Sequence, residues 1–192
     1  MLALLILLLS APTQMNPPRG TRQPAPDAGT VTPAQMSDEE VQDRIEMYLG
    51  TIHGPVTPGM WQRLGTRALP QLEKIVRDPE QLPTRRAGAL NGIAAIGSLT
   101  APDLMLEMAK DEKQPLQVRI AAMLGAERVV PDRVAQDLRP VMENATAGQV
   151  RRIAAEVMAA HGGCAAVQAQ AKREKSRDRM AKAVKTCSRL KK

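Results

Sequence analysis

Apolar side chains recur every three or four residues from residue 37 onward, with polar side chains between them. This is the period of an α-helix with one buried face, because residues i, i+3, i+4 and i+7 lie on the same side. No segment alternates apolar and polar residues as a half-buried strand does. The pattern therefore predicts an all-α domain. Helices are expected at residues 37–52, 58–77, 83–97, 101–110, 115–129, 132–144, 147–160, 164–174 and 177–190.

Local signals predict where several of these helices begin or bend. Ser37 and Glu40 have the spacing of a capping box, in which each side chain accepts a hydrogen bond from the other residue's backbone amide. Pro83 and Pro115 are expected in the first turn of their helices, where the missing N–H costs nothing. Pro70 falls inside the predicted helix 58–77 and is expected to kink that helix without ending it.

Three similar stretches of sequence follow one another. They are Thr84-Arg-Arg-Ala-Gly-Ala-Leu90, Val118-Arg-Ile-Ala-Ala-Met-Leu124 and Val150-Arg-Arg-Ile-Ala-Ala155, and they begin 34 and then 32 residues apart. A period in this range, with helical patterning throughout, is typical of stacked helical repeats. Aromatic residues are nearly absent, and we expect the single tryptophan, Trp61, to anchor the core of the first repeat.

At these stretches the chain resembles the HEAT-repeat family in its short bacterial form. The resemblance implies a right-handed α-solenoid of stacked antiparallel helix pairs, and it covers residues 57–163 best. In HEAT arrays an acid that ends the first helix of a pair and an arginine on the second helix form a ladder between repeats. The matching pairs in this chain are Asp78 with Arg85, Asp111 with Arg119, and Glu143 with Arg151. Their implied role is structural, and the family pattern says almost nothing about function.

Positive charge is concentrated at one end of the chain. Residues 172–192 hold ten Lys or Arg against two acids, whereas the remaining residues hold 17 basic and 18 acidic side chains. A basic end of this kind is typical of a segment that binds an acidic surface, and Lys182, Lys185 and Arg189 are its candidate contacts. The alternative is a solvated capping pair, residues 164–192, that keeps the end of the array soluble.

The first 36 residues differ in composition from the rest. Residues 1–11 have the pattern of a secretory signal peptide, because an apolar run too short to span a bilayer is followed by small residues. Residues 12–36 are rich in proline and predict a disordered linker before the helical domain of residues 37–192. An exported protein, periplasmic or secreted, is therefore expected. No basic residue precedes the run, so a frayed apolar end of a cytosolic protein is the alternative.

The two cysteines lie at equal distances from the predicted turn of the last helical hairpin. Cys164 and Cys187 are centred on Glu174-Lys175-Ser176, and residues equidistant from such a turn lie at the same level of the two helices. The sequence thus predicts a disulfide, worth roughly 2–4 kcal/mol, which agrees with export because disulfides persist in oxidising compartments. Two unrelated buried thiols are the alternative.

No motif of an enzyme or cofactor site is present. The chain has no glycine-rich phosphate loop, nucleophile elbow or dinucleotide fingerprint. A zinc site is not expected, because the cysteines lack the paired spacing and only His53 and His161 accompany them. His161 is expected to cap a helix C-terminus. We expect no catalysis, no metal and no cofactor.

Three functions remain compatible with the sequence. The favoured one is a monomeric, non-catalytic scaffold of the cell envelope or secreted fraction, which binds a protein partner along the concave face of the second helices, residues 83–97, 115–129 and 147–160. The second is a nucleic-acid binder that uses the basic C-terminal helix, although the basic charge does not follow the repeats. The third is a HEAT-like accessory lyase that loads chromophores, which only the resemblance supports.

Overall fold

The computed structural model describes residues 36–50, 56–174 and 176–190. The predicted signal peptide, the predicted linker up to residue 35, and His53 lie outside these residues. Residues Val31–Lys192 belong to one compact unit.

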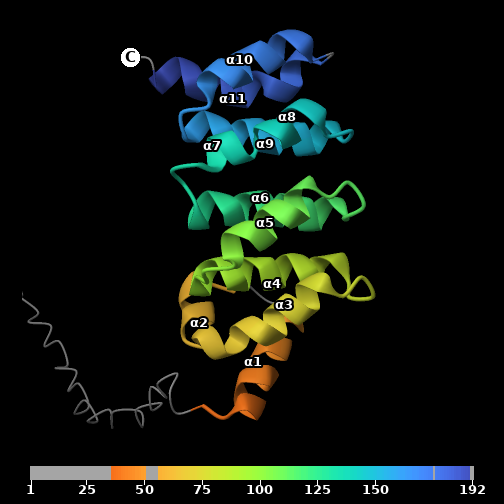
Figure 1. Ribbon diagram of the computed structural model, residues 1–192, viewed down its shortest axis with the longest axis vertical. Helices are drawn as coiled ribbons and strands as arrows, with labels where there is room; N and C mark the ends of the chain where they lie inside the picture. The colour runs from red at the N-terminus through yellow and green to blue at the C-terminus, as the bar shows by residue number, and fades with distance from the viewer. Residues whose placement is uncertain (1–35, 51–55, 175, 191–192) are drawn as a thin grey trace, which may run out of the picture. The chain divides into compact units, whose positions relative to one another are not determined.

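Within the described residues every regular element is a helix and none is a strand (Figure 1). The prediction of an all-α domain is confirmed. The helices are α1 (Asp38–Gly50), α2 (Pro58–Gln62), the short 3-10 helix η2 (Thr66–Ala68), α3 (Leu69–Arg77), α4 (Pro83–Ile96), α5 (Ala101–Lys110), α6 (Leu116–Val129), α7 (Val134–Asp137), α8 (Arg139–Asn144), α9 (Gly148–Ala160), α10 (Cys164–Arg173) and α11 (Arg177–Leu190).

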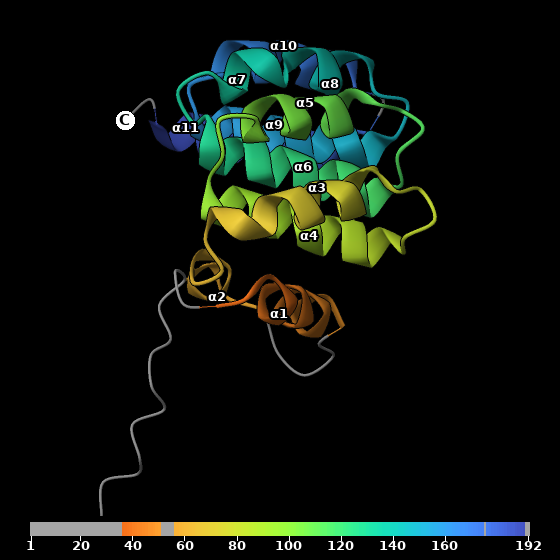
Figure 2. The ribbon, with the colours of Figure 1, turned by 60° about the horizontal axis from the view of Figure 1, so that its bottom comes forward.

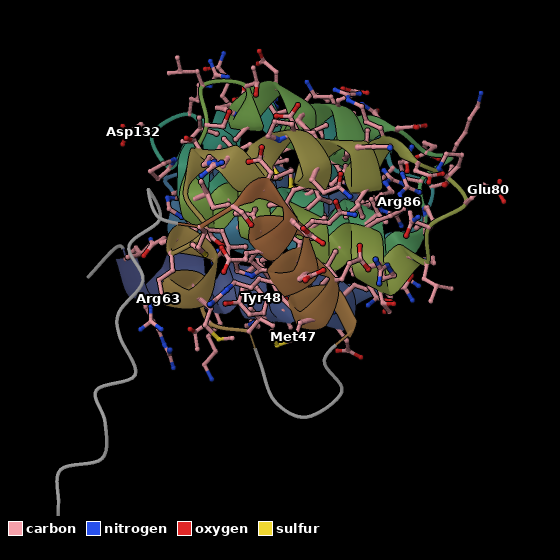
Figure 3. The ribbon with its side chains drawn as sticks, turned by 90° about the horizontal axis from the view of Figure 1, so that it is seen from below. Met47, Tyr48, Arg63, Glu80, Arg86 and Asp132 are labelled. Atoms are coloured by element: carbon pink, nitrogen blue, oxygen red, sulfur yellow. A yellow bond between two sulfur atoms is a disulfide. The ribbon has the colours of Figure 1, made fainter. Side chains whose placement is uncertain are left out.

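The helices from α3 onward pack in pairs, α3 on α4, α5 on α6, α8 on α9 and α10 on α11. The second helices of successive pairs also touch, so that α4 packs on α6, α6 on α9, and α9 on α11. First and second helices therefore lie on opposite sides of the packed unit (Figure 2). The loops that join the two helices of each pair lie along one edge. Figure 3 shows Glu80 and Arg86 at this loop edge, with Asp132 at the opposite side.

The two aromatic residues meet where α1 and α2 cover α4. Tyr48 and Trp61 are both buried and contact each other edge to face, with ring centroids 5.2 Å apart. Such a pair contributes about 0.5–1.5 kcal/mol beyond the area it buries. Gly92 of α4 lies beneath this pair, since a Cβ at that position would come within 3.0 Å of the Trp61 ring. Trp61 is a core residue, as the sequence predicts.

The single helix predicted at residues 58–77 does not form. The chain breaks between α2 and η2 at Gly65, whose φ of 65° and ψ of −170° lie in a region that only glycine adopts readily. Pro70 consequently sits in the first turn of α3, where it does not kink the helix. The predicted helix 132–144 is likewise divided into α7 and α8 at Leu138.

The folded domain begins one residue earlier than the predicted linker boundary allows. Met36 is buried, and its carbonyl accepts a hydrogen bond from the Arg67 side chain.

The capping box predicted at α1 is present. The Glu40 amide donates to the Ser37 hydroxyl at 3.1 Å, and the Ser37 amide donates to the Glu40 carboxylate at 2.7 Å.

We expect Gly65→Ala to lower the free energy of unfolding by about 1–3 kcal/mol, because alanine must adopt a backbone conformation reserved for glycine. The matched control is Gly59→Ala in α2, where a Cβ would meet nothing within 4 Å. This control is expected to leave stability unchanged or slightly raised. Urea unfolding monitored by circular dichroism measures both, and equal midpoints for the two variants would contradict the role of Gly65.

Candidate binding surface

Two buried arginines organise the loop edge of the helix pairs. Arg86 on α4 and Arg119 on α6 are only 4% and 3% exposed. The Arg86 Nε donates to the Val76 carbonyl at 2.8 Å, and the Arg119 Nε donates to the Ala109 carbonyl at 3.1 Å. Both carbonyls belong to the last turn of the preceding helix, where they lack helical partners and carry the negative end of the helix dipole. Each arginine thus ties its second helix to the end of its first helix.

The acid–arginine pairs implied by the HEAT resemblance take other partners in the structure. Arg85 is one residue out of register with Arg119, and it donates to Glu46 of α1 at 2.6 Å and to the Gln81 side chain at 3.1 Å. It reaches Asp78 only through Gln81, with no direct bond between the two. Arg119 lies near Asp111 but bonds to the Ala109 carbonyl and, at 3.5 Å, to Glu112.

Asp78 and Glu143 also bond elsewhere. Asp78 accepts from the side chain of Gln81, while Glu143 forms an ion pair with Arg139 of its own helix. Arg151 donates to the Ala145 carbonyl at 2.6 Å. It occupies the place of Arg119 in the third pair, but it does not contact Glu143.

A different set of polar links joins neighbouring pairs, and it passes through glutamine. The Arg86 guanidinium donates to the Gln114 side-chain carbonyl at 2.6 Å, and the Gln114 amide donates to Asp111 at 2.6 Å. Gln81 and Asp78 repeat this arrangement in the first loop. The sequence signal for it is an Asp-x-x-Gln spacing repeated 33 residues later, which an alignment on the arginines alone does not reveal.

The next link joins the second pair to the third. Thr146 donates to Glu112 from its amide at 3.1 Å and from its hydroxyl at 2.6 Å. These bonds, above all the one from the hydroxyl, lower the pKa of Glu112, while the bond from Gln114 lowers the pKa of Asp111. Both carboxylates are therefore held in their charged form.

The last link is the most buried ion pair of the described residues. The Glu174 side chain is 3% exposed and accepts two hydrogen bonds from Arg151, each 2.9 Å long. A third bond comes from Arg179 at 3.0 Å. The bonds from Arg151 hold the pKa of Glu174 below its ordinary value of 4.5 and raise the pKa of Arg151. This fork-shaped contact fixes α10 and α11 against α9.

Cys164 and Cys187 lie opposite each other on α10 and α11. Their sulfur atoms are at disulfide-bonding distance and their Cα atoms are 5.4 Å apart. This geometry is the one predicted from their spacing around the turn, and Cα separations of this size are usual for disulfides. The pair ties the last helix to its neighbour.

The three basic candidate residues of α11 are all exposed, but they differ in their partners. Lys182 forms an ion pair with Glu156 of α9 at 2.6 Å, and Glu156 also bonds to Arg152 at 2.8 Å. Lys185 and Arg189 form no ion pair with any described residue. Of the three, these two retain charge for an acidic partner.

The outward side of the second helices carries an apolar patch beside this charged group. Ile120 and Leu124 lie one turn apart on α6, and Leu124 is 44% exposed. Ile153 of α9 is half-buried, and α9 packs directly on α6. We call the exposed side of α6 and α9 around Ile120, Leu124 and Glu156 the second-helix face. Its mixture of apolar and charged groups suits contact with a protein surface.

Comparison with protein-family models, with curated proteins and with solved structures finds no match to this chain. Within the part of the chain that the structure describes, no three His, Cys, Asp or Glu side chains come together as metal ligands would. No described helix is long and apolar enough to cross a membrane.

We expect Glu174→Gln to lower the free energy of unfolding at neutral pH by about 2 kcal/mol, because Arg151 loses its charged partner in a buried position. A carboxyl whose pKa is lowered by folding contributes its stability in full above the ordinary pKa of 4.5 and loses it as the pH falls through the folded-state pKa. The difference between the wild type and Glu174→Gln should therefore shrink as the pH falls below that value.

The matched control is Glu143→Gln, which removes an i,i+4 ion pair at the surface and should cost about 0.5 kcal/mol or less. Denaturant unfolding at neutral and acidic pH measures both variants. A Glu174→Gln effect as small as that of Glu143→Gln, or one independent of pH, would show that the buried ion pair does not fix the last helix pair.

Proposed function

We propose that the chain is an exported, non-catalytic scaffold: a short HEAT-like solenoid that binds a protein partner through its second-helix face. The solenoid arrangement is supported by the successive contacts of α4, α6, α9 and α11 and by the equivalent roles of Arg86 and Arg119, 33 residues apart. Such arrays present extended surfaces for partners and require no catalytic group.

The observation that carries the binding surface is that the exposed Leu124 lies one turn from the partly exposed Ile120 on a packed helix. The sides of α6 that face α4, α5 and α9 are buried, whereas Leu124 is exposed, and Ile120, one turn earlier, packs partly against the core and stays partly exposed. Neighbouring apolar side chains left in contact with water on a packed helix favour a partner that covers them, whereas a single exposed apolar residue does not. The adjacent charges of Arg152, Glu156 and Lys182 would form the polar rim.

Export is supported by the cysteine geometry. A disulfide between Cys164 and Cys187 is stable in the periplasm or outside the cell, and cytosolic thiols are kept reduced. The leader expected at residues 1–11 agrees with this location.

A non-catalytic role is supported by the surroundings of His161, which occupies the end of α9. Its imidazole Nε2 lies 3.0 Å from the Glu127 carboxylate of α6. The contact joins two successive second helices, and we assign it a packing role in the scaffold.

The alternative function is nucleic-acid binding through α11. Lys185 and Arg189, which form no ion pair with any described residue, favour it. Against it, Tyr48 and Trp61 are buried in the core, so neither can stack on a base. A complex of this kind would weaken steeply as salt is added, whereas a complex at the second-helix face would tolerate salt.

Site-specific photo-crosslinking in the native host tests the proposed surface. A crosslinker in place of Leu124 should give a discrete protein adduct. The matched control is Leu99 in the loop between α4 and α5, an equally apolar residue that is fully exposed, at 101%. It should give none. Equal adducts at the two positions, or no adduct at either, would contradict the proposed surface.

A further inference from the structure

The last helix pair exposes a groove that the inner pairs do not have. Each inner pair is covered on both sides by neighbouring helices, whereas α10 and α11 contact described helices only on the side of α8 and α9. The groove between α10 and α11 has a volume of about 580 Å³. Ala171, Ala181 and Val184 give it an apolar floor. Gln168, Lys172 and Glu174 complete its lining, and the Glu174 carboxylate is already paired with Arg151 and Arg179. An apolar groove at the end of a stack is a natural place for another helix to pack.

Unpaired positive charge flanks this groove. Lys185 and Arg189 share one side of α11 and are exposed without an ion pair among the described residues. Lys172 on α10 is exposed as well. The helix α11 holds five basic residues and one acid, a formal charge of +4. A helix that packs here would be favoured if its outer face were acidic.

The opposite end of the described unit has such a helix (Figures 1 and 3). The helix α1 holds five acids and one arginine, a formal charge of −4. Val41, Ile45 and Tyr48 face the core. Glu39 and Asp43 lie on the other side, where they are exposed and form no ion pair with any described residue.

We propose that copies of this chain associate head to tail, with the acidic side of α1 in one copy against the basic residues that flank the groove between α10 and α11 of the next copy. The two surfaces differ in charge and lie at opposite ends of the unit, so the contact is heterologous. Any row of associated copies therefore ends with one unoccupied α1 surface and one unoccupied groove. This proposal goes beyond the scaffold function, since it leaves the second-helix face open, and it replaces the monomer expected from the sequence.

Opposite formal charges of 4 on the two helices make the association dependent on salt. At an ionic strength of about 0.01 M the screening length is about 30 Å, and it falls to a few ångströms near 1 M. An association driven only by apolar surface would show the reverse trend, because salts that favour burial strengthen it.

Sedimentation velocity of the full chain tests the proposal. At low ionic strength the average mass should rise with protein concentration above the monomer mass of 20.8 kDa, and high salt should return it to the monomer. Two variants change only exposed side chains that form no ion pair with a described residue, Glu39→Lys/Asp43→Lys and Lys185→Glu/Arg189→Glu. Both should therefore keep the wild-type melting temperature. Each should weaken self-association by about tenfold or more.

A mixture of the two variants gives the sharpest test. The first variant brings the formal charge of α1 from −4 to zero and keeps the basic α11, and the second brings α11 from +4 to zero and keeps the acidic α1. Neither should associate alone, while an equimolar mixture should form a heterodimer through the unchanged α11 of one and the unchanged α1 of the other. The control Lys110→Glu/Lys113→Glu changes the net charge by the same amount as Lys185→Glu/Arg189→Glu, but on exposed residues far from both ends, and should associate as the wild type does.

Three outcomes would overturn the proposal: a wild type that stays monomeric at low ionic strength, variants that associate like the wild type, or a mixture that does not recover association. None of these outcomes bears on the second-helix face, because crosslinking at Leu124 is a separate measurement.

Discussion

The buried arginines at the loop edge are the interaction on which the rest of the structure depends. A guanidinium removed from water costs several kcal/mol unless its surroundings replace that hydration. Among the described residues, Arg86 has no carboxylate as a direct partner and is held by the Val76 carbonyl and by Gln114. The compensation comes from the negative end of the α3 dipole, equivalent to about half a charge, and from carbonyls that would otherwise lack a donor. The Arg86 side chain therefore supplies a donor to a carbonyl at the end of α3 and holds α4 against that end.

Polar links along one edge leave the outward side of α6 and α9 outside the hydrogen-bond network. The links through Gln114, Glu112 and Glu174 use the loops between first and second helices, so the packed unit is joined there by hydrogen bonds as well as by apolar contacts. The outward side of α6 and α9 takes no part in these links. Leu124 is thus free for a partner without any loss of internal packing. The terminal helices are likewise free to carry opposite charge, since their outer sides pack against no described helix.

The sequence predicts the helices well, because strong signals mark their ends. The capping box of Ser37 and Glu40 and the proline of α4 lie where they are expected. It also predicts the cysteine pair, since equal spacing from a turn is enough to place two residues face to face. The prediction of one helix over residues 58–77 is wrong, because the apolar period continues through Gly65 although the backbone conformation of that residue ends the helix.

The polar contacts of the candidate surface are harder to predict, because a shift of one residue turns a helical side chain by about 100°. An alignment of the repeats on Arg85 pairs that residue with Arg119, whereas Arg86 has the equivalent buried place. Gln114 is missed for a different reason: a neutral side chain carries no charge signal. The pairing of Lys182 with Glu156 depends on how α9 and α11 pack, which no local pattern contains.

The central claim is that this chain is an exported scaffold whose last helices are joined by a disulfide. The most direct test is the intact mass of the protein from its native host, denatured but not reduced. The account predicts a mass that lacks at least the segment of about residues 1–11 and is lighter by two hydrogens than the corresponding dithiol. A full-length mass with both thiols free would contradict it, and would direct attention to nucleic acid as the partner of α11.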